Sequence, residues 1–226
     1  MKKCMIFAAG GFALDAVVGK TGAEIAAQCN DSLCIAADGG LKLMQALGIV
    51  PDLIIGDMDS LEEDSLLERY AADRTVRVKR LPVEKDDTDM LAAIREGLHA
   101  GCGFFELYGA LGGRIDHTLA NIQCLLFLLN HGAYGVLFGK GQRIELLKNA
   151  RICFPKDMYR KNRRLSVFAF GKDARGVTEK GLKYTLDDTV VRMDFPVGIS
   201  NEFLDCESFV EVKDGMLLVC VEDLQE

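Results

Sequence analysis

The chain has 226 residues, 49% of them hydrophobic and 27% charged, which is the composition of an ordinary globular protein long enough for one large domain or two modest ones. Its formal net charge is −7 and its pI is near 5.1. A nucleic acid would have to bind a local basic patch against this unfavourable field, so we expect no nucleic-acid partner.

The first residues look like a secretion signal because Lys2 and Lys3 precede an apolar stretch. Gly10, Gly11 and Asp15 interrupt that stretch, and no apolar run approaches the ~20 residues that a membrane span needs. We therefore expect a core strand here, no membrane partner and a cytoplasmic location. The eight cysteines include no C-x-x-C pair, and we interpret them as reduced packing residues.

Short apolar runs alternate with helix-like segments over the first part of the chain, residues 1–140. The runs are "CMIFAAG", "LCIAADGG", "DLIIGDMDS", "VRVKRLPVEKDD", "FFELYGALGG" and "YGVLFG". Apolar residues return every three or four positions in the segments 41–47, 90–98 and 119–129. This alternation predicts an α/β domain with a mostly parallel sheet flanked by helices.

The pattern changes in residues 141–226, where no long helical period is found. Short segments such as "RIELL", "RLSVFAF", "TVVRMDFPV", "FVEVKD" and "MLLVCVE" are separated by turn residues. This pattern predicts a smaller antiparallel β-sandwich domain.

Carboxylates follow several predicted strands of the first domain at the point where each strand ends. They are Asp38, then Asp57 and Asp59, then Asp86, Asp87 and Asp89, and finally Asp116. The carboxyl ends of parallel strands share one edge of the sheet, where ligands bind. Crowded carboxylates disfavour one another's ionisation, and Mg²⁺ relieves this because it prefers oxygen ligands and often binds carboxylates together with phosphates. We therefore predict a magnesium site at this edge.

The segment "GDMDS" shows how two acids reach one side of the chain. In an extended backbone the two-residue spacing points Asp57 and Asp59 to the same side, while Met58 turns away. Each acidic motif alone fits a helix cap or a turn equally well, so the prediction depends on their recurrence at successive strand ends.

The stretch "GALGGRIDHT" is a glycine-rich strand exit that leads into a helix expected from about Thr118. Backbone N–H groups and Arg114 can face an anion there, and Lys85 lies beside the acids of "DDTD". The chain has neither a G-x-x-x-x-G-K-[ST] loop nor a strand-linked G-x-G-x-x-G. These residues indicate a magnesium-dependent enzyme that acts on a phosphorylated substrate.

Taken in order, the motifs "AADGGL", "PDLIIGDMDSL", "KDDTDM", "GGRIDHTLANI" and "GISNEF" resemble the thiamine pyrophosphokinase family. The resemblance implies transfer of the pyrophosphoryl group of ATP to the hydroxyethyl oxygen of thiamine, giving thiamine diphosphate and AMP, with Mg²⁺ as cofactor. It also implies a homodimer whose active sites are shared between subunits. Residues 1–140 would bind ATP and magnesium, and residues 141–226 would bind thiamine and dimerise.

The resemblance also implies roles for individual residues. The metal ligands would be Asp57, Asp59 and Asp89, with Asp38 as a further catalytic carboxylate. The nucleotide would be bound by Gly39, Lys85, Thr88, Gly112, Gly113, Arg114 and Asp116, and thiamine by Ser200 and Asn201. Asp38 and Asp59 both remain candidates to accept the hydroxyl proton. Some relatives stack a tryptophan on thiamine, and since this chain has no Trp, Phe203 or Tyr184 would substitute.

Two other functions remain open from sequence. A metal-dependent nucleotide phosphohydrolase would use the same acids to activate water, but metal-ligating histidines would be expected beside them, and only His117 of the three histidines lies near the cluster. A non-catalytic thiamine- or nucleotide-binding protein has little need of so many uncompensated carboxylates.

Overall fold

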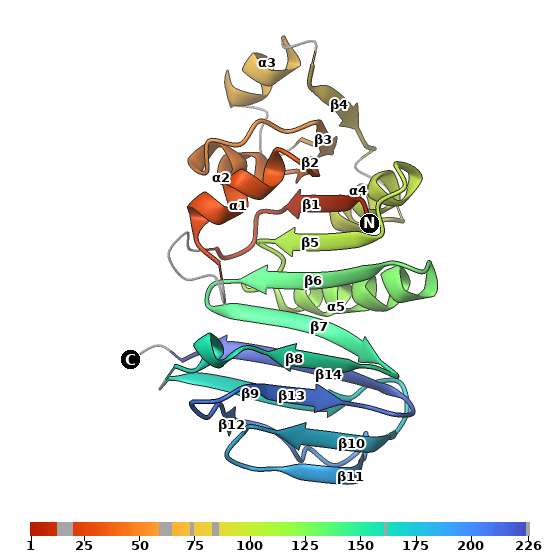
Figure 1. The fold of residues 1–226 in the computed structure, drawn as a ribbon. Helices are drawn as coiled ribbons and strands as arrows, with labels where there is room; N and C mark the ends of the chain where they lie inside the picture. Colours follow the sequence, from red (N-terminus) through yellow and green to blue (C-terminus); the bar gives the residue numbers. More distant parts are fainter. Residues whose placement is uncertain (13–19, 59–64, 73–74, 83–85, 161, 225–226) are drawn as a thin grey trace. The chain divides into compact units, whose positions relative to one another are not determined.

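The computed structural model describes residues 1–12, 20–58, 65–72, 75–82, 86–160 and 162–224. The chain divides into two compact units, Met1–Lys140 and Gly141–Glu226, which Figure 1 colours from red to green and from green to blue. The predicted fold class, a helix-flanked parallel sheet followed by a smaller antiparallel domain, is confirmed. Asp59 and Lys85 lie outside the described residues.

The strands of the first unit form one parallel sheet. Among the described residues of this unit, the strand order is β6-β5-β1-β2-β3-β4, and every neighbouring pair is parallel. The strands are β1 (Lys3–Phe7), β2 (Leu33–Ala37), β3 (Leu53–Gly56), β4 (Arg77–Arg80), β5 (Phe104–Tyr108) and β6 (Tyr134–Gly139). Their carboxyl ends therefore meet at one edge.

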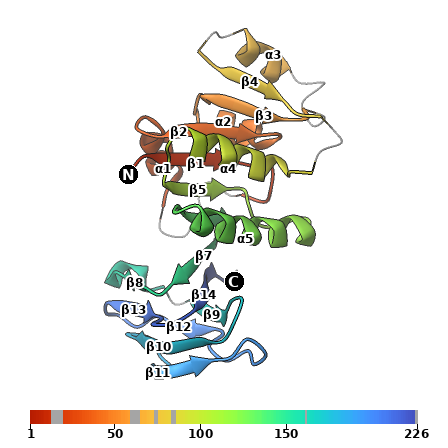
Figure 2. The same ribbon diagram turned by 90° about the vertical axis from the view of Figure 1, so that its right-hand side faces the viewer.

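Helices cover both faces of this sheet (Figure 2). They are α1 (Gly22–Cys29), α2 (Gly40–Ala46), α3 (Ser65–Ala71), α4 (Asp89–His99) and α5 (Ile115–Asn130). Successive residues of β1 point to opposite faces of the sheet. Met5 joins a core cluster with Ile25 of α1. Cys4 faces α4 on the other side, where its Sγ lies 3.0 Å from the position that a Cβ on Gly97 would take. A parallel sheet buried on both faces explains the almost continuous apolar runs of its strands.

The helix bounds correct one expectation. Helices α2 and α4 overlap the predicted segments 41–47 and 90–98, but α5 begins at Ile115 and not near Thr118. Ile115 is 77% exposed, so its side chain is not part of the buried apolar pattern of residues 119–129 from which the helix was predicted. The earlier start places Arg114 at the N-cap and Asp116 in the first turn. None of the helices formed by the described residues is long and apolar enough to cross a membrane.

The second unit is built from antiparallel strands and one short 3₁₀ helix, Lys156–Met158. The strands are β7 (Gln142–Lys148), β8 (Arg151–Phe154), β9 (Arg163–Ala169), β10 (Ala174–Lys180), β11 (Leu186–Val191), β12 (Asn201–Glu202), β13 (Ser208–Glu211) and β14 (Met216–Asp223). Within the described part of this unit, β12-β9-β14-β7 are neighbours in one sheet and β11-β10-β13-β8 in the other. The predicted strand "TVVRMDFPV" ends at Val191, because the residues after it are exposed and Pro196 has no N–H to donate to a ladder.

Candidate active site

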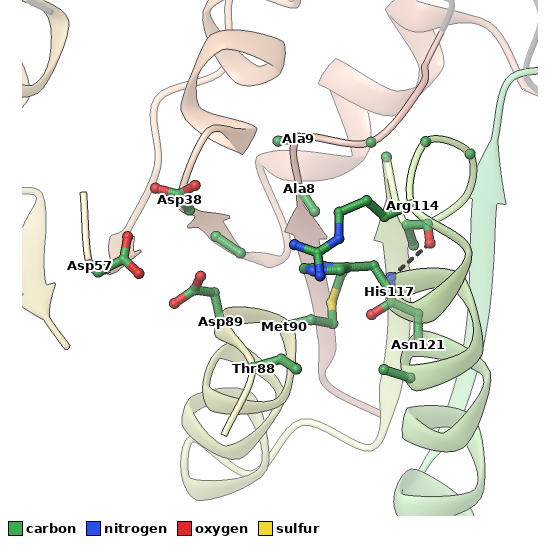
Figure 3. A pocket seen from close by; sticks show the side chains of 17 residues that line it. Ala8, Ala9, Asp38, Asp57, Thr88, Asp89, Met90, Arg114, His117 and Asn121 are labelled. Carbon is green, nitrogen blue, oxygen red and sulfur yellow. Dashed lines mark hydrogen bonds between the residues drawn. The ribbon is translucent and has the colours of Figure 1, made fainter. Parts of the chain in front are cut away.

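A cavity of about 400 Å³ lies at the carboxyl edge of the parallel sheet in the first unit (Figure 3). The residues that follow β1, β2, β3 and β5 line it, together with the first turns of α4 and α5. The lining includes Ala8, Ala9, Gly10, Asp38, Asp57, Thr88, Asp89, Met90, Gly112, Gly113, Arg114, His117 and Asn121. This is the edge at which the sequence predicts a ligand.

Three carboxylates converge in this cavity. One oxygen each of Asp38, Asp57 and Asp89 lies within 4.8 Å of the others, and all three residues are half-buried. Figure 3 shows these side chains pointing toward one another from the ends of β2 and β3 and from the start of α4. An all-oxygen donor set of this size fits a hard cation such as Mg²⁺.

The backbone between β2 and β3 explains why Asp38 and Asp57 are neighbours. The N–H of Asp38 donates to the carbonyl of Ile55 at 2.8 Å. A Cβ on Gly56 would stand 3.1 Å from the Cα of Asp38, so only glycine permits this approach without displacement. Met58 is fully buried while Asp57 lines the cavity. Met58 turns away from the cavity as predicted, but its φ of 68° shows that the backbone is not extended there.

The inner wall of the cavity depends on close contact between the ends of β1 and β5. The N–H of Gly10 donates to the carbonyl of Gly109 at 2.9 Å, and a Cβ on Gly10 would stand 2.2 Å from that carbonyl oxygen. Gly109 has φ 63°, and its own Cβ would stand 2.3 Å from the carbonyl oxygen of Ala8. Two glycines thus leave room for a ligand beside bare backbone.

Two helix N-termini open onto the same cavity. The Thr88 hydroxyl accepts a hydrogen bond from the N–H of Leu91 at 3.2 Å and caps α4, so the "DDTD" segment is both a helix start and part of the site. Gly112 and Gly113 have φ 83° and 74° and lead into α5. The N–H groups and dipoles of these helix ends favour an anion.

Arg114 and Asp116 form an ion pair at the start of α5. Their side chains are joined by hydrogen bonds of 3.1 and 2.5 Å, which raise the pKa of Arg114 and lower that of Asp116. Arg114 lines the cavity, whereas Asp116 is not among its lining residues. In this structure Asp116 contacts the cavity residue Arg114 and does not itself line the cavity.

Gly39 lies beside the acid cluster but lines an adjacent cavity of about 310 Å³. That cavity shares Ala8, Ala9 and Gly10 with the first one and is closed on its other side by α2. The two cavities therefore lie next to each other at the end of β1.

Ser200 and Asn201, the predicted thiamine ligands, lie in the second unit. Ser200 is exposed with φ 56°, and its N–H donates to the hydroxyl of Ser166 at 3.0 Å. Asn201 is only 3% exposed and bonds to Tyr184 and Glu179. Ser200 is thus available to a ligand, whereas Asn201 is committed to internal bonds.

Two protein-family models match successive parts of the chain. Residues 27–135 match the description "Thiamin pyrophosphokinase, catalytic domain", and residues 149–217 match "Thiamin pyrophosphokinase, vitamin B1 binding domain". The chain belongs to the thiamine pyrophosphokinase family. It is therefore an enzyme of the diphosphotransferase class, one that diphosphorylates thiamine.

Individual relatives agree with this assignment. Thiamine pyrophosphokinase of Bacillus subtilis (strain 168) is 28% identical over 188 residues, which cover 83% of this chain and 86% of that protein. A crystal structure of thiamine pyrophosphokinase from Bacillus subtilis superposes with a TM-score of 0.82 at 26% identity, covering 99% of this chain and 100% of the other. Thiamin pyrophosphokinase from Candida albicans, at 17% identity and a TM-score of 0.79 over 99% of this chain and 89% of the other, shares the fold.

The two aromatic residues considered for stacking on thiamine differ in exposure. Phe203 is 3% exposed and packs edge-on against Phe154 with ring centroids 5.4 Å apart. Tyr184 is 63% exposed. Of the two candidates to stack on thiamine in place of tryptophan, Tyr184 is the exposed one, and the Nζ of Lys183 lies 5.6 Å from the centroid of its ring.

Two cavity residues of this chain do not appear among the predicted ligands. His117 follows the Arg114–Asp116 pair in the first turn of α5 and lines the cavity. Asn121 is 8% exposed, and its amide donates to the carbonyl of Ala110 at 2.7 Å, which ties α5 to the strand exit. Their four-residue spacing in "HTLAN" places both on one helix face, a signal that could have linked them.

Proposed function

We propose that this chain transfers the pyrophosphoryl group of ATP to the hydroxyethyl oxygen of thiamine in a Mg²⁺-dependent reaction that releases AMP. The observation that carries the proposal is the convergence of three half-buried carboxylates and two helix N-termini on one cavity. Carboxylates alone would repel a triphosphate, so the arrangement favours a divalent cation bound between the carboxylates and the phosphates.

Asp57 and Asp89 would hold the cation, with Asp38 beside them and Asp59 as a further ligand implied by the family motif. When bound, Mg²⁺ neutralises phosphate oxygens and holds the nucleophile and the leaving group in line. The donor set fits this role because the three described carboxylates each offer an oxygen, and these oxygens lie within 4.8 Å of one another.

The remaining groups of the cavity would bind and orient the nucleotide. Arg114 and the N-terminus of α5 supply positive charge opposite the acids, which suits a transition state that spreads charge over phosphate oxygens. The thiamine hydroxyl must lose a proton during attack, and a carboxylate is the natural acceptor. Asp38 and Asp59 are both candidates.

We further propose that the chain works as a homodimer in which the second unit brings thiamine to the site of its partner. Apolar side chains close to Ser200 in sequence are exposed in the single chain: Met193 by 62%, Phe195 by 62% and Ile199 by 50%. An exposed cluster of this kind favours a protein interface. Light scattering should give twice the 24.8 kDa mass of the chain, and a monomer at assay concentration would contradict the shared site.

Product analysis tests the proposed reaction. We expect the purified protein, incubated with ATP, Mg²⁺ and thiamine, to form AMP and thiamine diphosphate in equal amounts, and to form neither when thiamine is left out. Nucleotide hydrolysis without thiamine would instead favour a phosphohydrolase. Saturable binding of thiamine without any product would favour a non-catalytic binding protein.

Ser200→Ala tests whether thiamine binds at the "GISNEF" turn. We expect the KM for thiamine to rise by about three- to tenfold, the equivalent of one hydrogen bond, with little change in the KM for ATP. Ser32→Ala, in the turn between α1 and β2 of the first unit, is the matched control and should leave both constants unchanged. A rise confined to the KM for ATP would contradict the placement of thiamine.

A further inference from the structure

Glu179 is a buried acid of the second unit that the proposed transfer does not use. It lies in β10, is 0% exposed and stands opposite Val210 of β13. Its Oε2 reaches the other sheet and accepts a hydrogen bond from the Nδ2 of Asn201 in β12 at 2.8 Å. Its Oε1 is buried without a hydrogen-bond partner among the described residues.

The side chain of Glu179 points toward the turn that carries Ser200. A Cβ on Gly198 would stand 3.8 Å from the Oε1 of Glu179 and 2.8 Å from a methyl group of Val167. Gly198 itself has φ 92°, and its carbonyl accepts a hydrogen bond from the N–H of Val167 at 2.9 Å. Because Gly198 has no side chain, the unpartnered Oε1 of Glu179 directly faces the backbone of this turn.

Asn201 connects Glu179 to this turn. Its Oδ1 accepts from the N–H groups of Tyr184 and Glu202, both at 3.0 Å, and its Nδ2 donates to the carbonyl of Tyr184 at 2.7 Å as well as to Glu179. The amide thereby uses its two donors and two acceptor positions. Because the adjacent Ser200 adopts a positive φ, which is unfavourable for a residue with a side chain, its conformation depends on such anchors.

The charge state of Glu179 is balanced near neutral pH. Burial raises the pKa of its carboxyl to about 7, against the opposing effect of the hydrogen bond from Asn201. The elements packed against it present apolar residues: Leu186 of β11, Val210 of β13 and Val167 of β9. Charged neighbours along the same elements are held in exposed or partly exposed ion pairs, namely Lys180–Asp187 at 3.3 Å, Lys183–Glu202 at 2.9 Å and Arg151–Glu211 at 3.2 Å.

We propose that Glu179 is a positioning residue that acts through Asn201 on the Gly198–Asn201 turn, and that its ionised form strengthens the binding of a cationic thiamine ring there. This inference rests on the proposed function. Ionisation strengthens the hydrogen bond from Asn201, because bonds to a charged acceptor are about twice as strong as neutral ones. A buried negative charge beside the turn also attracts the permanent positive charge of the thiazolium ring, with little screening by salt.

Both effects have the same sign, so the affinity for thiamine should rise with pH. We expect the thiamine KM of the parent protein to fall by about three- to tenfold between pH 6 and pH 8.5, which corresponds to the added strength of one charge-assisted hydrogen bond. The KM for ATP should not follow this profile, since Glu179 lies in the second unit.

Glu179→Gln is the test variant because glutamine keeps an acceptor for Asn201 but does not ionise. Its thiamine KM should stay at the parent's pH 6 value across the range. Glu211→Gln, which removes a partly exposed carboxylate of the same unit, is the control and should keep the parent's profile. If the parent forms no thiamine diphosphate, the proposed function is wrong and this inference falls with it. If the parent is active and Glu179→Gln shares its pH profile, the inference alone is wrong.

A second measurement decides the matter if Glu179→Gln does not fold. Binding and ionisation are reciprocally linked, so saturation with thiamine should lower the pKa of the Glu179 carboxyl, followed by ¹³C NMR in the parent protein. A glutamate pKa that thiamine leaves unchanged would overturn the proposal.

Discussion

Asp57→Asn and Asp89→Asn should each reduce the rate of thiamine diphosphate formation by at least about 100-fold, the scale on which loss of a single charge-stabilising group slows an enzyme. Each variant removes one negative charge from the cluster within which the ligand oxygens lie 4.8 Å apart or less. The amide keeps the shape of the side chain, and both positions are only half-buried, so the unfolding midpoint should change little. Steady-state kinetics over a range of Mg²⁺ concentrations would measure the effect.

Asp87→Asn is the matched control for these variants. Asp87 lies two residues before Asp89, but it pairs with Arg95 at 2.9 Å and lines a different groove, on the side of α4 that faces Lys79. We expect nearly parental activity from it. Equal losses in all three variants would show that general surface charge, and not a specific metal site, determines the rate.

Gly10→Ala should produce the second large effect, on stability and on the shape of the cavity together. The new Cβ would stand 2.2 Å from the carbonyl oxygen of Gly109 and 3.0 Å from that of Leu111. Backbone atoms cannot rotate away as a side chain can, so β1 and β5 must separate at the cavity wall. We expect the free energy of unfolding to fall by about 3 kcal/mol, at the upper end of the usual range for overpacking.

Gly11→Ala provides an adjacent control for this substitution. At Gly11 the nearest atom to an added Cβ would be 3.8 Å away, which is ordinary contact, so the change should be neutral or stabilise by up to about 1 kcal/mol through the unfolded chain. Urea unfolding and the KM for ATP would be measured for both variants. Similar behaviour of the two alanine variants would contradict the close approach of β1 and β5.

The sequence was sufficient to predict the convergence of acids because topology determines it. Once alternating strands and helices are assigned, the carboxyl ends of parallel strands share an edge, and Asp38 and Asp57 follow two adjacent strands. The spacing of "GDMDS" also separated Asp57 from the buried Met58. Both inferences need only local periodicity and one rule of chain connection.

Features that depend on three-dimensional packing could not be predicted from local sequence patterns. The start of α5 was missed because Ile115 is an exposed apolar residue outside the helical period. His117 and Asn121 face the cavity, but a lone polar residue in a helix gives no sign of which surface it meets. Asn201 was predicted to contact thiamine; the burial of its amide against Glu179 depends on a contact between two sheets, which no local pattern reveals.

The most direct measurement is an anomalous diffraction map of crystals that contain Mn²⁺, in place of Mg²⁺, and a non-hydrolysable ATP analogue. We expect one strong peak bonded to carboxylate oxygens of Asp57 and Asp89, at about the 2.1 Å typical of such small octahedral cations, with phosphate oxygens completing the coordination. A nucleotide bound in this cavity without a metal peak, or a peak at a distant site, would contradict the proposal that these carboxylates hold the ion used in the transfer.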